Sequence, residues 1–100
     1  MGYTLRIAPA VWAQVDAVDD WWRTQRPTAA TLFREELLAA FLRLETLPAS
    51  AKRYDLDPAG RARRLLLPRS RYFVYFDVEG DTVNVLAVWH AARGQGPLLR

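Results

Sequence analysis

Arginine is the residue type through which this chain is best equipped to do chemistry. Thirteen of its fourteen basic residues are arginines, and five of those fall within residues 61–71, a segment without any acidic residue. A guanidinium group is planar and binds carboxylates or phosphates through paired hydrogen bonds. A GC-rich genome would favour Arg over Lys, but it would not cluster the arginines. The cluster therefore predicts a surface that meets a specific anionic partner; it consists of Arg61, Arg63, Arg64, Arg69 and Arg71.

His90 is the only histidine, and histidine is the side chain best suited to exchange a proton near neutrality. No second candidate base lies near it in the sequence, so a hydrogen-bonded structural role at the end of a strand is favoured over acid–base catalysis. The chain has no cysteine, and His90 has no spaced carboxylate motif as a companion. We therefore expect no metal site, no cofactor, no disulfide and no thiol nucleophile.

The composition sets the class of protein that must position these residues. Half of the 100 residues are hydrophobic (51%) and a quarter are charged (25%), which excludes a disordered chain and predicts one domain over residues 1–100. No stretch approaches the roughly 18 apolar residues of a membrane span. The first residues lack the apolar core of a signal peptide, so we expect a cytoplasmic protein without a membrane partner.

Apolar spacing predicts two helices after a first strand at residues 3–8. Pro9 suits the start of a helix over residues 9–24, whose core face would hold Val11, Val15, Val18 and Trp22. Its other face would carry Asp16, Asp19 and Asp20. A second helix begins after a Thr28 cap and ends at Pro48. Its predicted core residues are Phe33, Leu37, Ala40, Phe41, Leu44 and Leu47.

Three strands are predicted after a loop at residues 48–60, at residues 63–67, 72–78 and 82–89. The fold class is therefore α+β with the order β-α-α-β-β-β, in which a helical hairpin packs on one face of a small, mainly antiparallel sheet. The strand at 72–78 is apolar on both faces, with Phe73 and Tyr75 opposite the other large side chains. The second face is thus expected to need a partner, unless the loop and the C-terminal tail cover it.

Two tryptophans are also candidates for contact with a partner. Trp22 continues the predicted core face of the first helix, whereas Trp12 and Trp21 lie off that face. Exposed tryptophan is enriched at protein interfaces. We expect either residue to contact another copy of the chain or a different protein.

The order of these elements resembles the ParE/RelE superfamily of toxins. Local matches add to it: Ala8-Pro9-Ala10 opens the first helix, Leu47-Pro48 follows the second, and Val88-Trp89-His90-Ala91-Ala92-Arg93 resembles the end of the family's last strand. The resemblance implies a toxin held inactive by a cognate antitoxin, whose acidic and apolar tail would pair with the arginines. Residues that bind antitoxin or target would then be Arg61, Arg63, Arg64, Arg69, Arg71, Phe73, Tyr75 and Arg93.

The superfamily includes RelE-like toxins that cut mRNA on the ribosome and ParE-like toxins that inhibit DNA gyrase by binding. Where similar nucleases carry an arginine inside the strand, this chain has Phe73, and the terminal Tyr or His position falls near Leu99. The ParE-like branch is therefore favoured, with no catalytic residues. The alternative is an mRNA endonuclease using Arg64, Arg71, His90 and Arg93. A third possibility is an inactive partner of an antitoxin, which would reach operator DNA only through that antitoxin.

Overall fold

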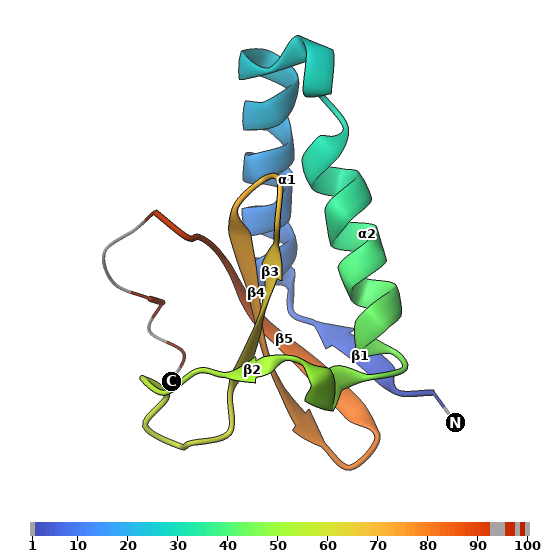
Figure 1. Ribbon diagram of the computed structural model, residues 1–100, viewed down its shortest axis with the longest axis vertical. Helices are drawn as coiled ribbons and strands as arrows, with labels where there is room; N and C mark the ends of the chain where they lie inside the picture. Colours follow the sequence, from blue (N-terminus) through green and yellow to red (C-terminus); the bar gives the residue numbers. More distant parts are fainter. Residues whose placement is uncertain (1, 93–95, 98, 100) are drawn as a thin grey trace.

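The chain folds into a five-stranded sheet with a helical hairpin on one face. This computed structural model describes residues 2–92, 96–97 and 99. Figure 1 shows α1 and α2 side by side on one side of the sheet, with α1 packed on β5 and α2 on β3. The predicted α+β class is confirmed. The elements are β1 Thr4–Ile7, α1 Pro9–Gln25, η1 Pro27–Ala29, α2 Leu32–Leu44, η2 Pro48–Ser50, β2 Lys52–Arg53, β3 Arg63–Leu67, β4 Tyr72–Glu79 and β5 Thr82–His90.

Both helices match the apolar spacing, but α2 departs from its predicted boundaries. α1 begins at Pro9, whose missing N–H costs nothing in the first turn. The predicted Thr28 cap is wrong, because Pro27 begins a short 3₁₀ turn and α2 starts only at Leu32. α2 also ends at Leu44, before Pro48. Leu47, predicted as a core residue, is consequently 63% exposed.

The strand order in the sheet is β1-β5-β4-β3-β2. β1 runs parallel to β5, and every other pair is antiparallel. Gly80, with φ of 60°, supplies the left-handed backbone of the turn between β4 and β5. The prediction of a loop throughout residues 48–60 is wrong, because Lys52 and Arg53 pair with Arg64 and Arg63. This short β2 forms one edge of the sheet.

The main core lies between the helices and one face of the sheet. Tyr75 and Phe76 are neighbours in β4, point to opposite faces of the sheet and are both buried, 1% and 0% exposed, because each face is covered. The pairing of β4 with β5 shifts register between Tyr75 and Phe76, which leaves one extra residue in β5. The same shift sends Ala87 and Val88 to the faces opposite those expected from simple alternation. Main-core residues include Val11, Val15, Phe33, Leu37, Leu44, Leu67, Val74, Phe76, Val83, Val85 and Val88.

The second face of the sheet is covered by the chain itself. Tyr54 packs on Tyr75 with ring centroids 4.8 Å apart, and Leu99 packs against the same cluster. The backbone at Gly96 passes so close that a Cβ there would lie 1.9 Å from the Tyr54 hydroxyl. Asp57 fixes the loop that carries Tyr54 by accepting hydrogen bonds from the N–H groups of Ala59, Arg61 and Ala62. The expectation that a partner must cover the centre of this face is therefore wrong, and the self-covering alternative holds there.

Across the described helices, none is both long enough and apolar enough to cross a membrane.

Candidate functional site

The arginines clustered in the sequence separate into two groups in the structure. Arg61, Arg63 and Arg64 lie where β2 meets β3, whereas Arg69 and Arg71 lie in the β3–β4 turn. The length of β3 separates the groups by roughly 16 Å, at about 3.3 Å per residue. Arg43, Lys52 and Arg53 join the first group from neighbouring elements. We call this first group the basic edge; its residues are Arg43, Lys52, Arg53, Arg61, Arg63 and Arg64.

Neutral acceptors hold several guanidinium groups of the basic edge in place. Arg63 Nη1 donates to the Ala51 carbonyl at 2.7 Å, and Arg53 Nη1 donates to the Gly60 carbonyl at 3.4 Å. Among the described residues, Arg61 alone in the basic edge forms an ion pair, with Nη2 3.9 Å from Asp77 Oδ2. Because neutral groups satisfy only part of each guanidinium, the remaining N–H groups stay available to an anion.

Arg64 lies on the face of the sheet opposite the helices. Its guanidinium carbon sits 4.1 Å from the centre of the Phe73 ring and 5.7 Å from that of Tyr54. Burial raises the pKa of the Tyr54 hydroxyl, as does Tyr75, while the Arg64 charge opposes this rise. Tyr75 is buried within the chain, so the prediction that it contacts a partner is not met in this conformation. Phe73, only partly buried, remains accessible.

The second arginine group sits in a turn that α2 holds. The Glu36 carboxylate accepts hydrogen bonds from the backbone N–H groups of Arg69 at 2.9 Å and Ser70 at 2.7 Å. Burial opposes ionisation of Glu36, but these N–H groups, with the Ser70 hydroxyl and the Arg69 charge, hold its pKa below the ordinary value. Arg71 has φ of 67° and an exposed side chain. Arg69 and Arg71 therefore sit on a turn fixed through its backbone.

His90 lies on the helical side of the sheet, away from Arg64. Its ring packs edge-on against Tyr72 at 4.8 Å, in a small cavity shared with Gln14 and Val18 of α1. Nδ1 accepts a hydrogen bond from the Ala92 N–H at 3.0 Å, as a structural histidine at a strand end would. The nuclease alternative placed His90 and Arg64 in one site, yet the sheet separates them. Arg93 lies outside the described residues.

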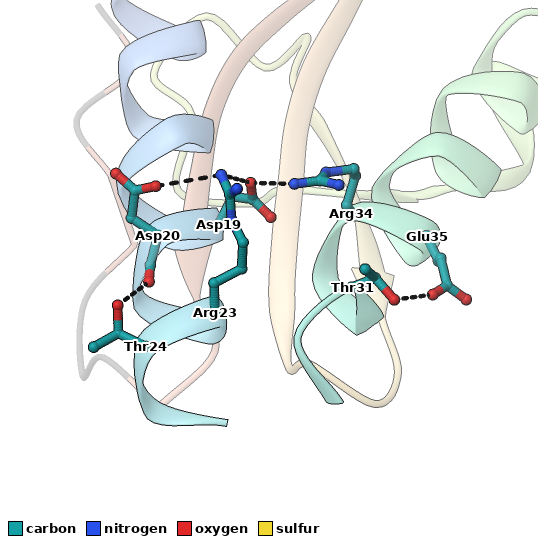
Figure 2. A network of polar contacts seen from close by, with 7 residues as sticks. All are labelled: Asp19, Asp20, Arg23, Thr24, Thr31, Arg34 and Glu35. Carbon is teal, nitrogen blue, oxygen red and sulfur yellow. Dashed lines mark hydrogen bonds and ion pairs between the residues drawn. The ribbon is translucent and has the colours of Figure 1, made fainter. Parts of the chain in front are cut away.

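An acidic residue between the helices escaped the sequence analysis. Asp19 was placed on the polar face of the first helix, but it is 7% exposed, and its Oδ2 accepts from Arg23 at 2.7 Å and Arg34 at 2.6 Å. Figure 2 shows Arg34 reaching across from α2 and Arg23 also contacting Asp20. The sequence spacing could have predicted this burial, since Asp19 follows Val15 by four residues and therefore lies beside it on the core face of the helix.

Beside Asp19 runs an apolar groove on the outer side of the helical hairpin. It encloses about 230 Å³ between Trp12 of α1 and Leu38 of α2, with Phe33, Leu37 and Phe41 at its floor. Trp12 is 46% exposed and Leu38 56%, so two large apolar side chains of the lining are open to solvent, and Asp16, Asp19 and Arg34 add charged groups to it. Trp21 is similarly exposed, as expected for a tryptophan off the core face. Within residues 2–92 and the described tail positions, no three His, Asp or Glu residues are grouped to hold a metal ion.

The comparisons with known proteins agree with this architecture. A family model described as the ParE toxin of the type II toxin–antitoxin system parDE matches residues 5–94. Among solved structures, the fold resembles a chain of the chromosomal ParDE toxin–antitoxin system from P. aeruginosa, with a TM-score of 0.74 and 21% identity. That match covers 88% of this chain and 95% of the other. No curated protein matches at the level of sequence. Because the family model spans nearly all of the chain, this protein belongs to the ParE toxins of type II toxin–antitoxin systems.

Proposed function

We propose that the chain is a single-domain cytoplasmic toxin that a cognate antitoxin neutralises and that inhibits DNA gyrase by binding to it. Family membership supports the pairing with an antitoxin. The outer groove at Trp12 and Leu38, together with the basic edge, provides apolar and cationic surface for partners. Neither the fold nor the residues on this surface require a cofactor for inhibition by binding.

The observation that favours binding over RNA cleavage is the placement of Arg64 and His90 on opposite faces of the sheet. Cleavage without a metal needs a proton-transfer group and a cation around one phosphate. In addition, β4 carries Phe73 beneath the Arg64 guanidinium, at the strand position where similar nucleases have an arginine. Arg64 and His90, two of the four residues of the nuclease alternative, thus do not meet around one phosphate in this conformation.

The antitoxin and the target are proposed to use different parts of the surface. The outer groove would receive apolar side chains of the antitoxin, and the basic edge its carboxylates, beside the partly buried Phe73 ring on which Arg64 stacks. The second group, Arg69 and Arg71, lies at the far end of β3 and is left for the target. Arg93 stays a candidate from the sequence alone.

Parallel assays of the purified toxin, released from its antitoxin, test this function. One assay follows gyrase supercoiling and gyrase-mediated DNA cleavage; the other follows mRNA on translating ribosomes. Inhibited gyrase with intact mRNA is the expected result. Cut mRNA with normal gyrase would overturn it, and His90→Ala and Arg64→Gln would then test catalysis. If neither gyrase nor mRNA is affected while antitoxin binding is retained, the chain is the third alternative, an inactive toxin-fold partner of the antitoxin.

A further inference from the structure

Cations lie directly opposite each other where β2 meets β3. Arg53 pairs with Arg63, and Lys52 pairs with Arg64. Like charges in such positions repel each other and destabilise a sheet. Because neighbouring residues of a strand point to opposite faces, the Arg53–Arg63 pair lies on the face that carries the helices, together with Phe76 of the main core. The Lys52–Arg64 pair lies on the other face. A bound anion would relieve this repulsion.

A cavity beside Arg53 and Arg63 is separate from the one beside Lys52 and Arg64. We call it the arginine pocket; it has a volume of about 260 Å³ and is lined by Arg53, Gly60, Arg61, Arg63 and Val78. The cavity beside Lys52 and Arg64 shares none of these lining residues. Arg53 and Arg61 are exposed and Arg63 is half-buried, so a ligand can reach all three from solution. Three arginines thus border one small space.

The backbone of the chain holds two of these arginines in place. Arg63 Nη1 donates to the Ala51 carbonyl at 2.7 Å, and Arg53 Nη1 donates to the Gly60 carbonyl at 3.4 Å. These neutral acceptors take up only part of the five N–H groups of each guanidinium. Donors that the fold already positions lose less conformational freedom when an anion binds to them. The arginine pocket is therefore prepared for an anion before one arrives.

The carboxylates near the pocket do not balance its charge. Asp77 Oδ2 lies 3.9 Å from Arg61 Nη2, whereas no ion pair within the described residues includes Arg53 or Arg63. Asp57 directs its carboxylate to backbone N–H groups of the loop before β3. The three arginines thus outnumber the one aspartate that forms an ion pair with them.

The number of arginines favours phosphate as the ligand. A carboxylate carries two oxygens in one plane, which a single guanidinium fork can satisfy. A phosphate group carries its oxygens at the corners of a tetrahedron, so more than one guanidinium can donate to it at once. We infer that the arginine pocket binds a phosphate group, carried by a nucleic-acid backbone or by a free nucleotide.

This site goes beyond the proposed function and divides the basic edge into two parts. The carboxylates of the antitoxin keep the cations outside the pocket, among them Lys52 and Arg64, which point to the other face of the sheet. Arg53, Arg61 and Arg63 form the phosphate site. Its occupation requires neither the antitoxin nor gyrase, so the purified toxin alone is sufficient to test it.

Titration with inorganic phosphate tests the site on the full chain. The side-chain N–H signals of isotope-labelled arginine, followed by NMR, report each guanidinium separately. The signals of Arg53, Arg61 and Arg63 should shift together and saturate, whereas that of Arg69, an exposed arginine beyond the far end of β3, should not. Acetate at equal ionic strength is the carboxylate control and should bind about tenfold more weakly or less.

Two sets of variants separate the geometry of the site from its charge. Arg53→Gln with Arg63→Gln removes two guanidinium forks and should weaken phosphate binding about tenfold or more. Arg53→Lys with Arg63→Lys keeps the charges but not the planar forks, so it should weaken binding as well. The matched control, Arg6→Gln with Arg26→Gln, removes the same charge from two exposed arginines outside the basic edge. It should bind phosphate like the wild type.

A short DNA duplex and ATP are the probes that identify the source of the phosphate. If a nucleic-acid backbone is the ligand, the glutamine variant of Arg53 and Arg63 should bind the duplex about tenfold more weakly, and the slope of log K against log salt should fall by about one. If a nucleotide is the ligand, the same variant should lose ATP binding instead. Either result supports the site and assigns its source.

Several outcomes would overturn the phosphate site. Equal shifts with phosphate and acetate would do so, as would a lysine variant that binds phosphate like the wild type. So would duplex and ATP binding that the glutamine variant retains in full. If the double glutamine variant does not fold, Arg53→Gln alone decides, because Arg53 is exposed and its side chain donates to the Gly60 carbonyl at a long 3.4 Å. A toxin that binds phosphate here but leaves gyrase active would overturn the proposed function and leave this site standing.

Discussion

Asp19 links the two helices through one carboxylate. Its carboxylate is nearly buried and accepts hydrogen bonds from Arg23 of its own helix and Arg34 of α2. Asp19→Asn should lower the free energy of unfolding by about 2 kcal/mol, since both bonds involve charged groups. Asp20→Asn is the control, because Asp20 is 75% exposed and its ion pair should contribute less than about 1 kcal/mol. Equal effects of the two changes in urea denaturation would contradict this role.

Gly96 is the residue where the tail backbone passes closest to Tyr54. A Cβ at Gly96 would lie 1.9 Å from the hydroxyl and 2.7 Å from the ring carbon that bears it, so the ring or the tail must move. Gly96→Ala should cost about 1–3 kcal/mol and increase Tyr54 exposure. Gly2→Ala, whose Cβ would meet only the Glu45 carbonyl at 3.5 Å, is the control. Thermal unfolding and tyrosine fluorescence would measure both; a wild-type Tm for Gly96→Ala would show that the tail does not seal this face.

At the scale of elements, Glu36 ties α2 to the β3–β4 turn in a pH-dependent way. Its pKa is depressed in the folded chain, so its stabilisation is present above the unfolded value near 4.5 and is lost as pH falls through the folded pKa. The difference in unfolding free energy between wild type and Glu36→Gln should therefore shrink between pH 6 and pH 3. Glu45→Gln controls for the loss of an exposed charge. If this difference in unfolding free energy does not change with pH, the charge of Glu36 is not its cause.

Periodicity predicted the elements well where side chains alternate or repeat, and it failed where the backbone departs from regular geometry. α1 and β3 lie within one residue of their predicted bounds. β2 escaped because Lys52 and Arg53 give no apolar alternation. The register shift at Tyr75 and Phe76 escaped because nothing in the residue types marks an extra residue in β5. Sequence spacing therefore predicted the four longer strands, but neither the short β2 nor the faces that Ala87 and Val88 occupy after the register shift.

For the molecule as a whole, the candidate site depends on which surfaces the chain covers for itself. The sequence predicted an uncovered sheet face, but Tyr54 and the tail close it, and the largest exposed apolar side chains lie mostly on the helices. The sequence predicted one surface from the clustered arginines, but the length of β3 divides them between the basic edge and the β3–β4 turn. Charge clustering along a chain thus predicts that a cationic surface exists, whereas only the strand pairing shows where it lies.

The exposed outer groove should make the free toxin depend on its partner for solubility. Changing Leu38, in the groove lining, and Leu42, one helical turn beyond it in α2, to lysine removes two apolar side chains that are 56% and 66% exposed, so folding should change little while aggregation decreases. If the antitoxin fills the groove, the same variant should bind it roughly 10- to 100-fold more weakly. Leu47→Lys with Leu56→Lys, at positions 63% and 70% exposed and outside the groove lining, is the matched control. Titration calorimetry of each variant with the antitoxin measures this binding. Equal weakening by both pairs would indicate a nonspecific effect of charge, because only the first pair includes a residue of the groove lining.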